Sequence, residues 1–105
     1  MITGHYILHD HTPVPEPDTL TWARWFSTAE RRVAYTEFTN EVSVSTVFLG
    51  LDHNFFGCPP LLFETMIFGA DEDYQERYAT WDAAAAGHAA VVAWLVEDGL
   101  VLKDS

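Results

Sequence analysis

Residues 42–69, VSVSTVFLGLDHNFFGCPPLLFETMIFG, decide the fold expected of this chain. Both Val42–Leu51 and Leu61–Gly69 are rich in β-branched, aromatic and other large apolar residues, which favour strands. The segment Gly57–Pro60 between them carries the glycine and prolines of a loop. Two apolar strands joined by a loop most simply pair antiparallel, so this stretch predicts a β-hairpin.

Side-chain alternation predicts the register of that hairpin, because the more apolar rows of the two strands should lie together. The register that brings them together places Val47 opposite Ile67. In the same register Glu64 lies opposite Gly50, on the sheet face of Asp52 and diagonal to it. The sequence therefore predicts two carboxylates side by side near the tip of the hairpin.

The predicted face around Glu64 also carries Phe48, Met66 and Phe68. An ionised Glu64 among them is costly if it is buried without a partner. Two arrangements are open. Either the face is exposed and forms a contact surface, or a helix covers it and Glu64 has a partner such as Arg77.

Further elements are expected before the hairpin. Tyr6–Asp10 is a candidate for a short strand, and Thr12–Pro17, with three prolines, has the composition of a linker or extended arm. Asp18 is predicted to cap a short helix over residues 19–32. A strand rich in β-formers is predicted at Val33–Asn40.

After the hairpin, an acidic loop at Gly69–Tyr74 leads to a helix predicted over residues 81–97, with Thr80 as its N-cap and Gly99 as its stop signal. Gly87 weakens this helix by about 1 kcal/mol. Helical spacing puts four residues on its buried face: Ala84, His88, Val91 and Leu95.

These elements predict one α+β domain over residues 1–105. We expect an antiparallel sheet of three or four strands, a short N-terminal helix, and a long C-terminal helix packed on one face of the sheet.

The charge of the chain limits its partners. There are 16 Asp and Glu residues against 5 Lys and Arg, for a formal net charge of −11. Such a chain repels phosphates, so direct binding of DNA or RNA is not expected. The charge either keeps the protein soluble or forms a surface that docks on a basic protein.

The candidate docking patch is acidic, with one tryptophan that could anchor a partner. Its residues are Asp71, Glu72, Asp73, Glu76 and Trp94. The acidic run lacks the spaced ligands and glycine of a calcium loop, and a solvated loop is the alternative interpretation. Trp94 either covers the edge of the core or contacts a partner, since tryptophan is enriched at binding hot spots.

Targeting and redox features are few. The single cysteine, Cys58, permits no disulfide within the chain. The first residues lack the basic and apolar regions of a signal peptide. No segment approaches the roughly 20 apolar residues that span a bilayer. We therefore expect a cytoplasmic protein without a membrane partner and without a cofactor.

Asp52, His53 and Glu64, with His88, are the candidate catalytic group, because carboxylates and imidazoles serve as acids, bases and metal ligands. Adjacent strand residues point to opposite faces, so Asp52 and His53 meet one ligand only if the strand ends or bulges. The chain has no HExxH, GxSxG or phosphate-binding glycine motif. No catalytic residue is assigned, and His88 is interpreted as a hydrogen-bonded core histidine.

His5, His9 and His11 fall on one face of a strand and form a second candidate group. Three imidazoles can bind Zn²⁺, but a flexible N-terminus holds a metal poorly. The sequence therefore favours exposed histidines, and no metal site is assigned.

Four segments resemble a group of small uncharacterised proteins that bacteriophages and prophages encode. They are WARWFSTAERRVAYTEF (22–38), VSVSTVFLGLDHNF (42–55), PPLLFETMIFG (59–69) and RYATWDAAAAGH (77–88). The resemblance covers most of the chain, although Phe56 and Cys58 stand where a more glycine-rich loop is expected. It implies a cytoplasmic protein made in an infected bacterium, and it implies no activity.

The sequence thus predicts a non-enzymatic, acidic phage protein with an anti-defence role. It would dock on a basic surface of a host or defence protein, as a nucleic-acid mimic in the manner of anti-CRISPR proteins. Two alternatives stay open. One is a small hydrolase or metal-binding protein using Asp52, His53 and Glu64. The other is a homo-oligomeric phage accessory protein, such as a homodimer, using the face of Phe48, Met66 and Phe68.

Overall fold

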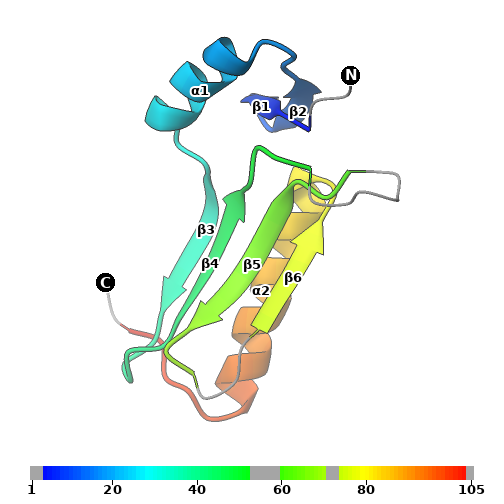
Figure 1. Cartoon of the computed structure of the whole chain (residues 1–105). Helices are drawn as coiled ribbons and strands as arrows, with labels where there is room; N and C mark the ends of the chain where they lie inside the picture. Colours follow the sequence, from blue (N-terminus) through cyan, green and yellow to red (C-terminus); the bar gives the residue numbers. More distant parts are fainter. Residues whose placement is uncertain (1–3, 53–59, 71–73, 104–105) are drawn as a thin grey trace.

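The computed structural model describes residues 4–52, 60–70 and 74–103. The described chain forms two helices and six strands, and the expected α+β class is confirmed (Figure 1). In chain order the elements are β1 (Tyr6–His9), β2 (Thr12–Pro15), α1 (Thr19–Thr28), β3 (Arg32–Glu37), β4 (Ser43–Phe48), β5 (Phe63–Phe68), β6 (Tyr74–Tyr78) and α2 (Trp81–Glu97).

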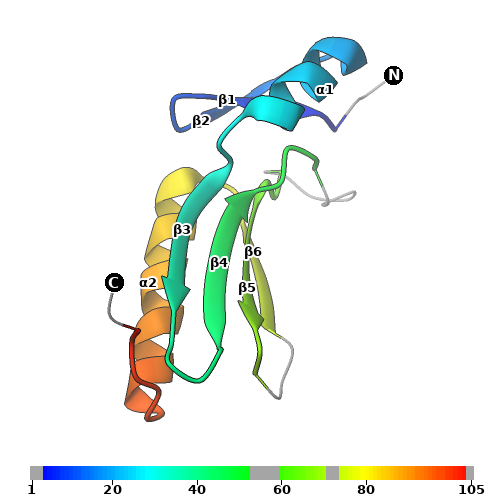
Figure 2. The same cartoon turned by 90° about the vertical axis from the view of Figure 1, so that its left-hand side faces the viewer.

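The main sheet has the order β3-β4-β5-β6, with antiparallel neighbours throughout. The chain then returns along one face of this sheet as α2, while the other face carries no helix (Figures 1 and 2). The prediction of an antiparallel sheet of three or four strands with a long helix on one face is therefore confirmed. The hairpin of β1 and β2 lies with α1 at one end of the sheet (Figure 2).

The predicted register of the central hairpin is wrong. Val47 pairs with Glu64, three residues from the expected Ile67, and Phe48 pairs with Phe63. Because three is an odd number, the error exchanges the two faces of β5 relative to β4. Glu64 therefore does not lie opposite Gly50.

The cause of the error lies at the end of β4. The prediction extended this strand to Leu51, but β4 ends at Phe48, and Gly50 has a positive φ of 76° that takes the chain out of the strand. The carbonyl of Gly50 accepts hydrogen bonds from the Tyr6 N–H at 2.8 Å and from the Trp22 Nε1–H at 3.1 Å. The Leu49 N–H still donates to the Leu62 carbonyl at 2.7 Å, but from Gly50 onward the chain is tied to the N-terminal elements.

The core lies between α2 and the sheet. The helix buries the four residues expected from its spacing: Ala84, His88, Val91 and Leu95. One core cluster comprises Phe38, Val42, Val44, Ile67, Val91 and Leu95. The other comprises Phe48, Leu62, Phe63 and Ala84. The helix therefore covers the sheet face of Phe48, which the sequence had placed beside Glu64.

Two expectations for the N-terminal third are corrected. Thr12–Pro17 is not wholly a linker, because Thr12–Pro15 forms β2 and Ile7 pairs with Val14 of this strand. The helix predicted over residues 19–32 ends at Thr28. It stops early because Arg31 already bonds to β4: its carbonyl accepts from the Phe48 N–H at 2.7 Å, and its guanidinium donates to the Phe48 carbonyl at 3.0 Å.

Strand β6 was not predicted, and only its first residue, Tyr74, fell within the predicted acidic loop Gly69–Tyr74. Its central residues are polar, but Tyr74 and Tyr78 point to the core clusters, and Arg77 alternates to the other face. At the opposite edge the C-terminal segment runs beside β3, since the Thr39 N–H donates to the Val101 carbonyl at 2.9 Å. A short, charged edge strand gives a weak sequence signal because only its inward residues are apolar.

Glu64 lies on the sheet face that α2 leaves open, and it has a partner. Only 8% of Glu64 is exposed, and its Oε2 atom accepts from Nε of Arg77 at 3.0 Å and from Gln75. Phe48 is buried on the opposite face, while Phe68 on the open face is 48% exposed. The predicted patch of Phe48, Met66 and Phe68 is therefore corrected, because Phe48 does not belong to it.

Candidate functional site

The predicted catalytic group is not assembled as the sequence suggested. The register that placed Glu64 diagonal to Asp52 is wrong, and Glu64 is engaged by Arg77 within the sheet. Asp52 lies beyond β4, where its backbone N–H donates to the Gly4 carbonyl at 2.8 Å. His53 lies outside the described residues.

The N-terminal histidines do not share a site. His5 stacks on Trp22 with ring centroids 4.3 Å apart, whereas His11 stacks on Trp81 at 3.7 Å. Asp10, with a φ of 59°, turns the chain between β1 and β2 and thus breaks the strand pattern that put the histidines on one face. Within the described residues, no group of three His, Cys, Asp or Glu side chains is placed to hold a metal ion.

His88 is the hydrogen-bonded core histidine that the sequence predicted. Its Nε2 atom lies 2.9 Å from the Thr36 hydroxyl and its Nδ1 atom lies 2.8 Å from the Thr46 hydroxyl. The Thr46 hydroxyl is in turn hydrogen-bonded to the Thr65 hydroxyl at 2.5 Å. Burial lowers the pKa of His88 because the charged imidazolium loses water. This network joins α2 to three strands, so its role is structural.

Cys58 lies outside the described residues.

Trp94 lines a groove at the end of the sheet where α2 finishes. The groove has a volume of about 580 Å³, and we call it the Trp94 groove. Residues from four separate parts of the chain line it, among them Val42, Ile67, Tyr74, Trp94, Leu95 and Asp98. Trp94 is 50% exposed, and its ring lies 6.0 Å from that of Tyr74. Trp94 therefore forms part of the groove wall and keeps half of its surface exposed.

The predicted acidic patch is described only in part. Asp71, Glu72 and Asp73 lie outside the described residues, and Glu76 is exposed on β6. The acidic run is nevertheless flanked in sequence by two lining residues of the groove, Ala70 before it and Tyr74 after it.

The carboxylates between residues 33 and 102 have few cations in this stretch of the sequence to balance them. Between residues 33 and 102 the only Lys or Arg is Arg77, and its guanidinium is bound to Glu64. The groove itself includes Asp98. The surroundings of Trp94 are thus negative, which attracts cationic groups.

Sequence reasoning missed Tyr74 and Asp98 as part of this site. Tyr74 had a weak signal, since it alternates with Tyr78 at even spacing across a polar segment. Asp98 had none, because only the docking of α2 brings it beside Tyr74 and Val42.

No family model, curated protein or solved structure matches this chain. No helix within residues 4–52, 60–70 and 74–103 is long and apolar enough to cross a membrane.

Proposed function

We propose that this protein is a non-enzymatic binding protein of phage origin that docks on a basic surface of a host or defence protein. The Trp94 groove is the contact site. The observation that carries the proposal is a half-exposed tryptophan in a groove that includes Asp98, within a stretch of sequence, residues 33–102, whose one Lys or Arg is bound to Glu64.

The chemistry of the groove defines the partner. Trp94 and Tyr74 present aromatic surface that excludes water around an apolar side chain. Asp98, exposed Glu76 and the acidic run attract Lys and Arg residues around that contact. The partner is therefore a protein segment that combines an apolar anchor with basic neighbours.

Such a surface suits a mimic of nucleic acid. A host or defence protein that binds DNA or RNA carries a basic surface for phosphates. An acidic protein that occupies this surface blocks the access of nucleic acid to the host or defence protein, without itself binding nucleic acid. The net charge of −11 supports this mode, because it favours encounter with a basic protein and opposes encounter with phosphates.

Capture from a bacterial host lysate tests the proposal. Tagged wild-type protein is compared with Trp94→Ala and with reversal of Asp71, Glu72, Asp73 and Glu76 to Lys. Val96→Ala is the matched control, because Val96 is an exposed apolar residue of α2 outside the described lining of the groove. We expect wild type and Val96→Ala to retain one basic protein that both groove variants lose.

The retained protein should also elute with rising salt, and the wild type should displace nucleic acid from it. The proposal fails if the charge-reversed protein and Trp94→Ala capture the same partners as wild type. Circular dichroism of each variant shows whether a lost interaction reflects a lost fold.

A further inference from the structure

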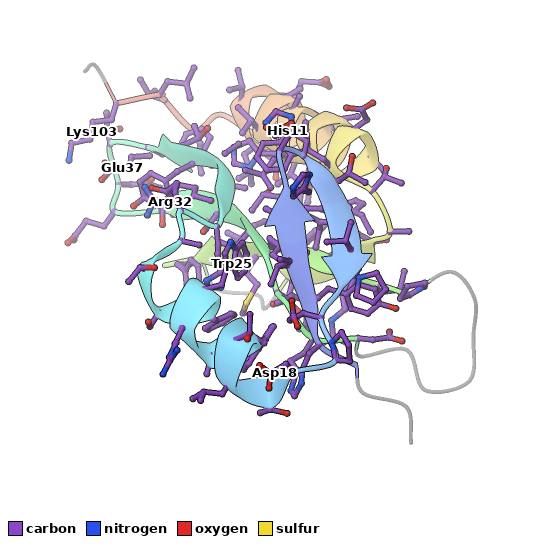
Figure 3. The ribbon with its side chains drawn as sticks, turned by 90° about the horizontal axis from the view of Figure 1, so that it is seen from above. His11, Asp18, Trp25, Arg32, Glu37 and Lys103 are labelled. Atoms are coloured by element: carbon purple, nitrogen blue, oxygen red, sulfur yellow. The ribbon has the colours of Figure 1, made fainter. Side chains whose placement is uncertain are left out.

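A second hollow, which we call the hairpin cleft, opens at the end of the molecule opposite the Trp94 groove. It lies among the tip of the β1–β2 hairpin, α1, the start of β3 and the start of α2, and its volume is about 740 Å³. This size is within the range of small-molecule sites. Figure 3 shows this end from above, with Trp25 between α1 and the sheet and His11 near the start of α2.

Two tryptophans, Trp25 and Trp81, line the hairpin cleft. Trp81 has one face covered by His11, whose ring is coplanar with it to within 2°. Trp25 packs on the core through Phe48, with the two rings at 85° to one another and their centroids 5.8 Å apart. Trp25 is only half-buried, so part of its indole contributes to the wall of the cleft.

The charge in the hairpin cleft is negative. Asp10 and Glu30 line it and are exposed. Arg32 also lines it, but its Cζ atom lies 4.4 Å above the ring of Tyr35, which is outside the described lining. Glu30 uses only Oε1 locally, accepting from the backbone N–H of Arg32 at 3.0 Å. Two carboxylates and one guanidinium thus line the same cleft as the indole of Trp25, which leaves these charged side chains with a net negative charge, and the guanidinium also contacts the ring of Tyr35.

We infer that the hairpin cleft binds an organic cation, either an alkylammonium or a guanidinium group, against Trp25. The face of an indole ring attracts cations, and the carboxylates of Asp10 and Glu30 balance the charge. An anion is opposed by both carboxylates and by the net charge of −11. This site does not depend on docking at the Trp94 groove.

Nuclear magnetic resonance of the ¹⁵N-labelled full chain tests this inference site by site. The four tryptophans each contribute one indole N–H resonance, and Trp25→Phe identifies that of Trp25. The probe is N-acetyl-arginine methylamide, and its neutral isostere N-acetyl-citrulline methylamide is the control. We expect the arginine probe to move the Trp25 resonance saturably at millimolar concentration, with no such movement for the citrulline probe.

Butylammonium distinguishes the two classes of cation, an alkylammonium and a guanidinium group. If it also saturates the Trp25 resonance, the site accepts free amines. If only the arginine probe does so, the site is selective for guanidinium side chains. Either result supports a cation site.

Two variants remove charge while keeping the local structure. Glu30→Gln retains a side-chain oxygen for the Arg32 N–H, and Asp10→Asn suits the positive φ at this position. Each should weaken binding of the arginine probe by about two- to fivefold. Glu97→Gln is the matched control, because it removes one exposed carboxylate at the far end of α2, and it should leave the affinity unchanged.

Three results would overturn the inference. One is the absence of saturable movement of the Trp25 resonance with either cation. Another is equal movement with the citrulline probe. The third is an equal loss of affinity in Glu97→Gln and Glu30→Gln, which would show a general effect of net charge.

Discussion

The hydroxyl end of Tyr78 lies in the space that a side chain at Gly87 would occupy. A Cβ atom added at Gly87 would stand far inside van der Waals contact with the Oη, Cζ and Cε1 atoms of this ring. Tyr78 packs against the core cluster that includes Phe48 and Phe63, which limits its freedom to move aside. Gly87 is therefore a notch in α2 that admits the ring from β6.

Gly87→Ala should destabilise the protein, although helix propensity alone predicts a gain of about 1 kcal/mol. Overpacking against Tyr78 costs about 1–3 kcal/mol, so we expect a net loss of up to about 2 kcal/mol in the free energy of unfolding. Urea denaturation measures this change. The control is Ala86→Gly at an exposed neighbouring position, which should lose about 1 kcal/mol from propensity alone. A Gly87→Ala protein more stable than the wild type would contradict the inference that Gly87 makes room for the ring of Tyr78.

His88 should make stability depend on pH. Burial lowers its pKa in the folded state from the model-compound value of 6.5, so the unfolded chain binds more protons between the folded pKa and 6.5. The contribution of His88 is therefore fully present above pH 6.5 and is lost as the pH falls through the folded pKa. Urea midpoints above and below pH 6.5 measure this loss.

A matched variant isolates the histidine. His88→Gln keeps polar atoms near Thr36 and Thr46 but does not titrate. It should lower stability at neutral pH and flatten the pH dependence in this window. If the pH dependence is as steep in His88→Gln as in wild type, other groups cause it.

Arg77→Met should destabilise the sheet by about 1–3 kcal/mol, because it leaves the nearly buried Glu64 without its cation. Lys103→Met is the comparison. It breaks the exposed Lys103–Glu37 pair, whose atoms are 3.5 Å apart, and should cost no more than about 1 kcal/mol.

A double-mutant cycle with Glu64→Gln completes this test. Once the carboxylate is neutral, Arg77→Met should cost less than it does in the wild type. Additive losses in thermal or urea unfolding would show that the two side chains do not interact.

Removal of the two predicted helix caps should lower the free energy of unfolding by different amounts. The Thr80 side chain accepts from the Ala83 N–H at 3.0 Å, so Thr80→Ala should cost about 1 kcal/mol. Asp18 stands at the N-cap position of α1 but makes no side-chain bond to the helix backbone; it accepts from the Thr21 hydroxyl instead. Asp18→Ala should therefore cost less than Thr80→Ala in urea denaturation, and the reverse order would contradict this assignment.

Local patterns predicted most of the secondary structure. Residues 81–97 form α2 with the expected cap and buried face, because helical spacing, Thr80 and an alanine-rich run all act within a few residues. The core of β4 was predicted for the same reason, since β-branched residues dominate it. The end of α1 was missed because contacts of Arg31 with Phe48, distant in sequence, override helix propensity there.

The candidate sites also combine features that local sequence predicts with features that only the tertiary structure creates. The exposure of Glu76 agrees with the solvated acidic segment that the sequence suggested, and the sequence left both coverage of the core and exposure open for Trp94. The Trp94 groove exists only because α2 brings Asp98 into the same lining as Tyr74. The hairpin cleft likewise needs Asp10, Trp25 and Trp81 from three separate elements. No local pattern encodes such distances.

The sequence by itself determined the types of α1, α2, β4 and β5, the buried face of α2 and the negative charge, because each depends on neighbouring residues or on composition. Only the tertiary structure decided the register of β4 and β5, and with it the face on which Glu64 lies. The physical reason is that alternation permits several registers. The positive φ of Gly50 and its hydrogen bonds to Tyr6 and Trp22 end the strand at Phe48, and the sheet face that remains apolar is the one that α2 buries.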